Sequence, residues 1–158
     1  MQRLYFLAVL AGALALLSLG GCATGTGLSD AQRLALYREH AGAPQRDFRY
    51  TTRQLTGWTA LGDEALAVWT KPNEAYLLEF GGGGCRDLNA ASTILLTNLL
   101  GQVSAGMDRV QVLNRPAGFN IACRIQTIRA LDTKAIRASE KALRQARTAQ
   151  RDAAPASD

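Results

Sequence analysis

Residues 65–80, ALAVWTKPNEAYLLEF, predict the β-hairpin around which the rest of the domain is organised. Residues 65–70 carry almost no polar side chain on either face, which is typical of a central strand covered on both sides. Residues 71–74 contain proline and asparagine and are expected to reverse the chain. In the strand that follows, alternation places Tyr76, Leu78 and Phe80 on one face and Leu77 and Glu79 on the other.

Further short strands are predicted on both sides of this hairpin. Before it, residues 55–61 carry Trp58 and lead into a turn at residues 62–64. After it, Val110 and Val112 indicate a strand that ends in a turn at residues 114–118.

The clearest strand pattern lies at residues 119–126, where Phe119, Ile121, Cys123 and Ile125 alternate with more polar residues. Residues 88–107 carry no charge, and their periodicity does not decide between helix and strand. We expect a turn of helix near residues 87–91 and then a strand. The expected fold class is α+β and mostly β, an antiparallel meander or small barrel of about six strands.

A short helix is expected before the sheet. Ser29 and Gln32 fit a capping box, in which each side chain bonds the backbone amide of the other residue. The buried face of this helix and its end are indicated by Leu34, Tyr37, Ala41, Gly42 and Pro44.

A longer amphipathic helix is predicted over residues 132–152. We expect its alanine face to dock only weakly, because alanine buries little area. The alternative to a solvated helix, laid on its own domain or fraying from it, is contact of its basic face with anionic envelope polymers or lipid headgroups. The candidate contact residues are Lys134, Arg137, Lys141 and Arg144, and the alanine face, edged by Ile136 and Leu143, comprises Ala135, Ala138, Ala142, Ala146 and Ala149.

The N-terminus predicts export and lipidation. Residues 1–21 have a positive start and an apolar run, as bacterial signal peptides do, and Leu19-Gly20-Gly21-Cys22 resembles the lipobox at which lipoproteins are cut and lipidated. The alternatives are an uncleaved membrane helix, or an ordinary secretory cut that leaves Cys22 as a thiol. Because Ala23 is not aspartate, the lipoprotein rule implies the outer membrane, facing the periplasm, in a Gram-negative host.

The expected organisation follows from these elements. Residues 1–21 are the leader, 22–47 a lipid tether with the short helix, 48–131 the β domain, 132–152 the basic helix and 153–158 a disordered tail. The net charge is +5, and +4 once Arg3 leaves with the leader, which is too mild for a nucleic-acid-binding protein.

Cysteine usage predicts one disulfide. With Cys22 taken by lipid, Cys85 and Cys123 are an even pair in an oxidising compartment. A reactive pair or nucleophile is the alternative, although no Cys-x-x-Cys is present and His40 is the only histidine. One histidine and two cysteines are too few for a zinc site, so no metal and no cofactor are expected.

Three features have both a structural and a functional interpretation. The glycines at residues 81–84 form either a flexible connection that brings Cys85 to its partner or a backbone nest for an anion beside Arg86. His40 is either a surface residue at a helix end or catalytic. The acids that a small hydrolase would use are Asp63, Glu64, Asp87 and Asp108, and the adjacent pair among them more often forms a solvated turn.

A wider pattern runs from Trp58 through Val68-Trp69-Thr70 and Tyr76-Leu77-Leu78 to Cys85 and Cys123. It resembles a family of small proteobacterial envelope lipoproteins of unknown function and spans residues 48–129. The resemblance implies lipidation and a Cys85–Cys123 pair, and it implies no activity. The glycine run and the basic helix lie outside the pattern and are expected to be particular to this chain.

The function expected from the sequence is a non-enzymatic binding or envelope-maintenance module that presents a surface to a periplasmic protein or cell-wall partner. No histidine, cysteine or carboxylate set stands at catalytic spacing. The alternatives are an inhibitor of an envelope-directed enzyme such as lysozyme and, less favoured, a small hydrolase that uses acidic residues.

Overall fold

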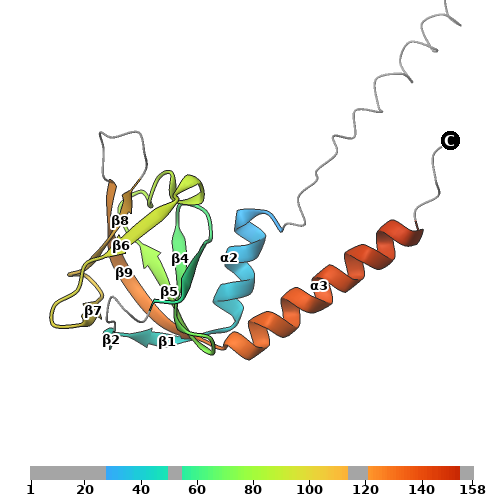
Figure 1. Ribbon diagram of the computed structural model, residues 1–158, viewed down its shortest axis with the longest axis horizontal. Helices are drawn as coiled ribbons and strands as arrows, with labels where there is room; N and C mark the ends of the chain where they lie inside the picture. The colour runs from blue at the N-terminus through green and yellow to red at the C-terminus, as the bar shows by residue number, and fades with distance from the viewer. Residues whose placement is uncertain (1–27, 50–54, 114–120, 154–158) are drawn as a thin grey trace, which may run out of the picture.

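The computed structural model describes residues 28–49, 55–113 and 121–153. The leader, Cys22, the turn at 114–118 and the tail at 154–158 lie outside the described residues. Within them, two α-helices and nine strands form one mostly β domain (Figure 1). The helices are α2 Asp30–Glu39 and α3 Thr133–Ala153, with a single 3-10 turn, η1, at Leu88–Ala90. The strands are β1 Ala41–Gln45, β2 Asp47–Arg49, β3 Gly57–Ala60, β4 Ala65–Lys71, β5 Glu74–Phe80, β6 Thr93–Leu96, β7 Gln102–Ser104, β8 Arg109–Leu113 and β9 Ile121–Leu131.

The main sheet is antiparallel and curls into a half-barrel, which confirms the expected fold class (Figure 1). Its strand order is β3-β4-β5-β9-β8-β6. Strand β1 pairs with the C-terminal part of β9, residues 128–131, whereas β8 pairs with its N-terminal part, residues 121–124. The short strands β2 and β7 pair separately. These strands and β1 were not predicted, because they are short and β1 has three exposed residues in a row.

The hairpin of β4 and β5 lies in the centre of the sheet, as predicted. Leu66 pairs with Leu78 and Val68 with Tyr76, so these side chains share the concave face. Ala67 pairs with Leu77 on the convex face. Both faces are covered, which explains the lack of polar residues in β4.

Two apolar clusters hold the layers together. The first fills the concave side of the half-barrel and includes Phe48, Leu88, Val103, Val110, Ile125 and Ile128. The second lies between the convex side of the sheet and the helices, and includes Leu34, Tyr37, Leu61, Leu131 and Ile136. The 3-10 turn at Leu88–Ala90 followed by β6 confirms the expectation for residues 87–97.

Helix α2 begins as predicted and ends earlier than predicted. The amide of Gln32 donates to Ser29 Oγ at 3.3 Å, and the amide of Ser29 donates to Gln32 Oε1 at 2.9 Å, so the capping box is confirmed. The helix stops at Glu39 instead of Gly42, and Ala41 already pairs with Leu131. The prediction of Gly42 as terminator was therefore wrong, because pairing with β9 recruits residues 41–45 into the sheet.

Helix α3 docks through one edge of the predicted face. The five alanines of the predicted face are exposed, apart from half-buried Ala135, whereas Ile136 is 1 % exposed and Leu143 is half-buried. The larger aliphatic side chains bury more area and therefore decide which side meets the domain. Beyond Leu143 the helix projects past α2 into solvent (Figure 1).

Candidate functional site

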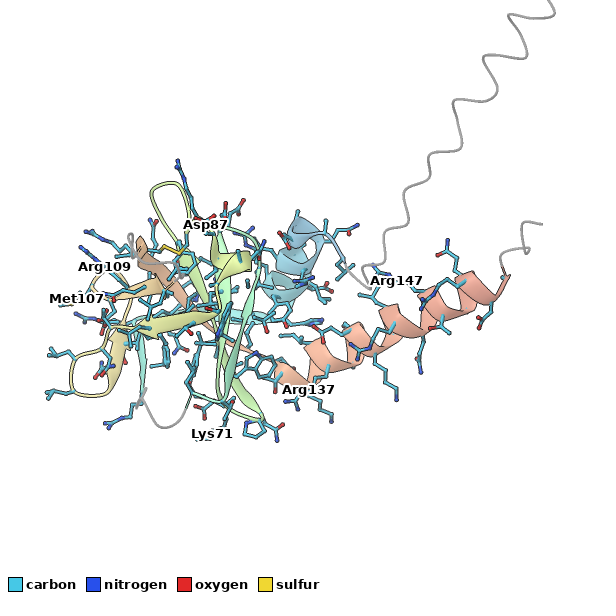
Figure 2. The ribbon with its side chains drawn as sticks, turned by 45° about the horizontal axis from the view of Figure 1, so that its top comes forward. Lys71, Asp87, Met107, Arg109, Arg137 and Arg147 are labelled. Atoms are coloured by element: carbon cyan, nitrogen blue, oxygen red, sulfur yellow. A yellow bond between two sulfur atoms is a disulfide. The ribbon has the colours of Figure 1, made fainter. Side chains whose placement is uncertain are left out.

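Cys85 and Cys123 form a disulfide, as predicted, with their Cα atoms 5.3 Å apart. It joins the loop after β5 to β9, and both residues are buried in the concave cluster (Figure 2). Burial in an apolar cluster suits a structural cross-link rather than a reactive pair.

A hollow of about 550 Å³ lies beside this disulfide. It is on the outer side of β9, because the lining residues Ala122, Arg124 and Gln126 alternate with Cys123 and Ile125, which belong to the concave cluster. Its lining is glycine-rich and polar, and consists of Gly81, Gly82, Gly84, Gly106, Ala122, Cys123, Arg124 and Gln126.

The glycine run forms one wall of the hollow and has a left-handed backbone. The φ angles of Gly82, Gly83 and Gly84 are +69°, +101° and +80°. A Cβ on Gly84 would lie 2.6 Å from the carbonyl oxygen of Asp63, the same oxygen that accepts the Cys85 amide at 2.6 Å. The loop thus connects β5 to Cys85 and anchors this residue beside the hollow.

The cation at this hollow is Arg124, not Arg86. Arg124 on β9 stands directly opposite Arg109 on β8, and both side chains are exposed. No residue in the described part of the chain forms an ion pair with Arg109 or Arg124. Arg86 does not line the hollow. Sequence analysis missed this pair because it depends on the register between two strands.

The four predicted basic contact residues share one side of α3, but they are not equivalent. Arg137 donates to Asn73 Oδ1 at 2.8 Å and to the carbonyl of Pro72, and its guanidinium lies 5.5 Å from the ring centre of Trp69. Arg137 therefore clamps α3 to the β4–β5 turn. Arg144 is only 3.9 Å from Glu140 on its own helix, and Lys134 and Lys141 are exposed.

A polar seam joins α2 to α3. The Tyr37 hydroxyl donates to Glu140 Oε1 at 3.3 Å, and His40 Nε2 lies 3.0 Å from Ser139 Oγ. Burial, reinforced by the charge of Glu140, raises the pKa of Tyr37 to about 12. Sequence analysis placed no nucleophile near His40. The structure brings Ser139 to it, as a contact that ties the end of α2 to the second turn of α3.

Two of the four candidate acids have polar partners in the structure. Asp108 accepts from Thr97 Oγ1 and from the Ser104 amide, at 2.9 Å and 2.7 Å, and so braces the loops around β7 and β8. Glu64 pairs with Arg38, whereas Asp63 and Asp87 are exposed. Among the described residues, no three of the types His, Cys, Asp and Glu are grouped closely enough to hold a metal ion.

No helix among the described residues is long and apolar enough to span a membrane. Neither the curated proteins nor the solved structures contain a match to this chain. One family model matches residues 5–147, which is longer than the 48–129 of the resemblance and takes in α2, the glycine run and most of α3. The match covers most of the chain, and the protein belongs to the family of unknown function DUF6491.

Proposed function

We propose that this protein is a non-enzymatic binding module of the bacterial envelope, anchored by lipid on Cys22, whose helix α3 rests on the anionic surface of the same membrane. The anchor is supported by the lipobox at residues 19–22 and by a family match that begins at residue 5, inside the proposed leader. The disulfide uses the two other cysteines, which leaves Cys22 for lipid. Ala23 suits transport to the outer membrane, on its periplasmic side.

The arrangement of the two helices carries the proposal for α3. The helices meet where His40 and Tyr37 contact Ser139 and Glu140, and they diverge from there (Figure 1). The N-terminal end of α2 and the C-terminal end of α3 therefore point to the same side of the domain. Only residues 23–27 separate Cys22 from Leu28, a covalent reach of at most about 20 Å.

The length and charge of α3 suit this position. Its 21 residues span about 32 Å, so its projecting half extends well beyond the sheet. Lys134, Lys141 and Arg144 are exposed along one side. Each basic residue near an anionic lipid surface contributes about 1 kcal/mol, which adds to the binding of the acyl chains.

The anchor is tested by labelling cells with radioactive palmitate. We expect the label in the wild-type protein and none in Cys22→Ala, which also fails to float with membranes. Labelling of Cys22→Ala would contradict the anchor.

The role of α3 is tested with the mature lipoprotein reconstituted in phosphatidylethanolamine vesicles, with and without phosphatidylglycerol. Hydrogen exchange of the amides in residues 141–153 is expected to slow roughly tenfold when the anionic lipid is present. The double variant Lys141→Glu/Arg144→Glu should lose this protection. A matched charge reversal at the exposed Arg46 and Arg49, on the opposite end of the domain, should keep it. Equal exchange in both vesicle types would overturn the proposal for α3 and leave the anchor untouched.

A further inference from the structure

We propose that the hollow between the Gly81–Gly84 loop and β9 is a binding site for a phosphate group. The site lies within the β domain, so it does not depend on lipidation. It combines Arg124 in its lining, Arg109 opposite Arg124 on the neighbouring strand but outside the lining, an open glycine backbone and a rigid frame, which together are the elements of an anion site.

The arginines supply a positive charge that the protein itself does not neutralise. Arg109 and Arg124 occupy directly opposed positions on antiparallel strands, where like charges repel each other. No ion pair within the described residues relieves this repulsion. Inorganic phosphate, with close to two negative charges, and a phosphodiester headgroup, with one, both present oxyanion acceptors to the guanidinium groups, which bind tetrahedral oxyanions through paired N–H donors.

The glycine wall supplies backbone donors. Gly82 and Gly83 have positive φ, and a Cβ on either would meet nothing within 4 Å. Their amides have no hydrogen-bond partner among the described residues. A loop without side chains lets a ligand reach the backbone directly, which is how glycine-rich loops hold phosphates.

The frame holds this wall in place before any ligand binds. Cys85, directly after the glycines, is fixed by the disulfide to Cys123 and by its amide bond to the Asp63 carbonyl. Gln126 closes the opposite side, with its Oε1 beside Gly81. The backbone carbonyl of the exposed Asp63 faces the loop, where it accepts the Cys85 amide.

The hollow is also connected to the tethered end of the domain. Gly84 packs on Asp63, and the neighbouring Gly62 packs on Asp30 at the start of α2. Asn89, in the turn after the loop, donates to Asp30 Oδ2 at 2.6 Å. Two sources of the phosphate group fit this position: a soluble compound, and a phospholipid headgroup of the membrane to which the domain is tethered. The titrations below distinguish them.

The test uses the mature lipoprotein in non-ionic detergent, observed by ¹⁵N NMR. Titration with inorganic phosphate should shift the amides of Gly82, Gly83 and Gly84 to a plateau, whereas chloride at equal ionic strength should not. Arg124→Gln is expected to weaken binding roughly tenfold or more, because it removes a charged hydrogen-bond donor. Arg151→Gln, which removes the same charge at the far end of α3, should leave the affinity unchanged.

A second titration adds phosphatidylglycerol to the micelles. Saturable glycine shifts with either phosphate source support the site and identify the source. The proposal would be overturned if the glycine amide shifts in both titrations equalled those caused by chloride. It would also be overturned if Arg124→Gln and Arg151→Gln weakened phosphate binding equally. If Arg124→Gln loses the dispersed spectrum of the folded protein, Arg109→Gln replaces it and carries the same expectation.

Discussion

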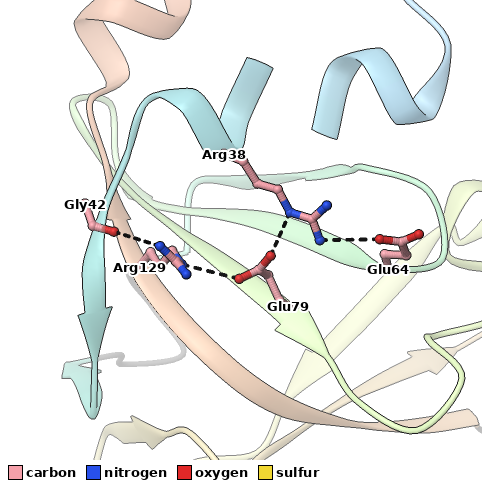
Figure 3. Close-up of polar contacts among 5 residues, drawn as sticks. All are labelled: Arg38, Gly42, Glu64, Glu79 and Arg129. Carbon is pink, nitrogen blue, oxygen red and sulfur yellow. Dashed lines mark hydrogen bonds and ion pairs between the residues drawn. The ribbon is translucent and has the colours of Figure 1, made fainter. Parts of the chain in front are cut away.

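The carboxylate of Glu79 lies 2.8 Å from Nε of Arg38 and thereby fastens α2 to strand β5 (Figure 3). The same carboxylate is 3.4 Å from Nε of Arg129 on β9, and Arg129 also donates to the carbonyl of Gly42 on β1. One acid thus connects a helix with three strands at the place where the chain passes from α2 into the sheet.

We expect Glu79→Gln to lower the free energy of unfolding by about 1 to 2 kcal/mol, because Glu79 is only 17 % exposed and serves two arginines. The measurement is urea unfolding followed by circular dichroism. Glu64→Gln is the matched control, since Glu64 pairs with the same Arg38 but is 69 % exposed, and exposed pairs contribute little. A loss of equal size in both variants would contradict this ranking.

Arg137 is expected to stabilise the docking of α3. Arg137→Gln removes the contacts with Pro72 and Asn73 and the stacking on Trp69, which should cost about 1 to 2 kcal/mol and change the fluorescence of Trp69. Arg144→Gln removes the same charge from the same side of α3 but only a 3.9 Å contact within the helix. The unfolding curve and tryptophan spectrum of Arg144→Gln should match those of the wild type. If Arg144→Gln destabilised the protein more than Arg137→Gln, Arg137 would not be the residue that holds α3 on the domain.

Tyr37 should make the domain sensitive to high pH. Its phenol titrates at about 12 in the folded protein and at 10.0 in the unfolded chain, so the folded state keeps a proton that the unfolded state loses. The stabilisation is complete below pH 10 and is lost as the pH rises toward 12, with a maximum of about 2 to 3 kcal/mol. The unfolding free energy of Tyr37→Phe should therefore decrease less between about pH 9 and pH 11.5 than that of the wild type. The same loss in both proteins would show that other groups cause it.

Leu100 is held in an unfavourable backbone conformation. Leu100 and Gly101 form a two-residue hairpin loop with φ of 53° and 76°, closed by two hydrogen bonds between Leu99 and Gln102. Turns of this kind favour asparagine followed by glycine. Leu100 is also 98 % exposed, so its side chain contributes no packing.

We therefore expect Leu100→Asn to raise the unfolding free energy by about 1 kcal/mol. Leu99→Asn, at a position that is 70 % exposed and has no positive φ, is the control and should have little effect. A thermal unfolding midpoint that stays the same or falls in Leu100→Asn would contradict the assignment of strain to this turn.

Much of the fold could be predicted because its signals are local. The capping box of Ser29 and Gln32, the turn at residues 71–74 and the alternation that buries Cys123 and Ile125 depend on neighbours in the chain. The rest of the fold depended on contacts between residues that are far apart in the sequence. Ala41 leaves the helix because Leu131 pairs with it. For α3, Ile136 beneath α2 sets the buried side, and this overrides the alanine periodicity.

The sequence by itself determined the central hairpin, the pairing of Cys85 with Cys123 and the basic character of α3, because each follows from residue type and spacing. Only the tertiary structure decided which charges are free. Arg137 is engaged by the β4–β5 turn, whereas Arg124 faces Arg109 beside an open glycine loop. Such relationships arise from strand register and helix docking, which bring together residues that no periodicity connects.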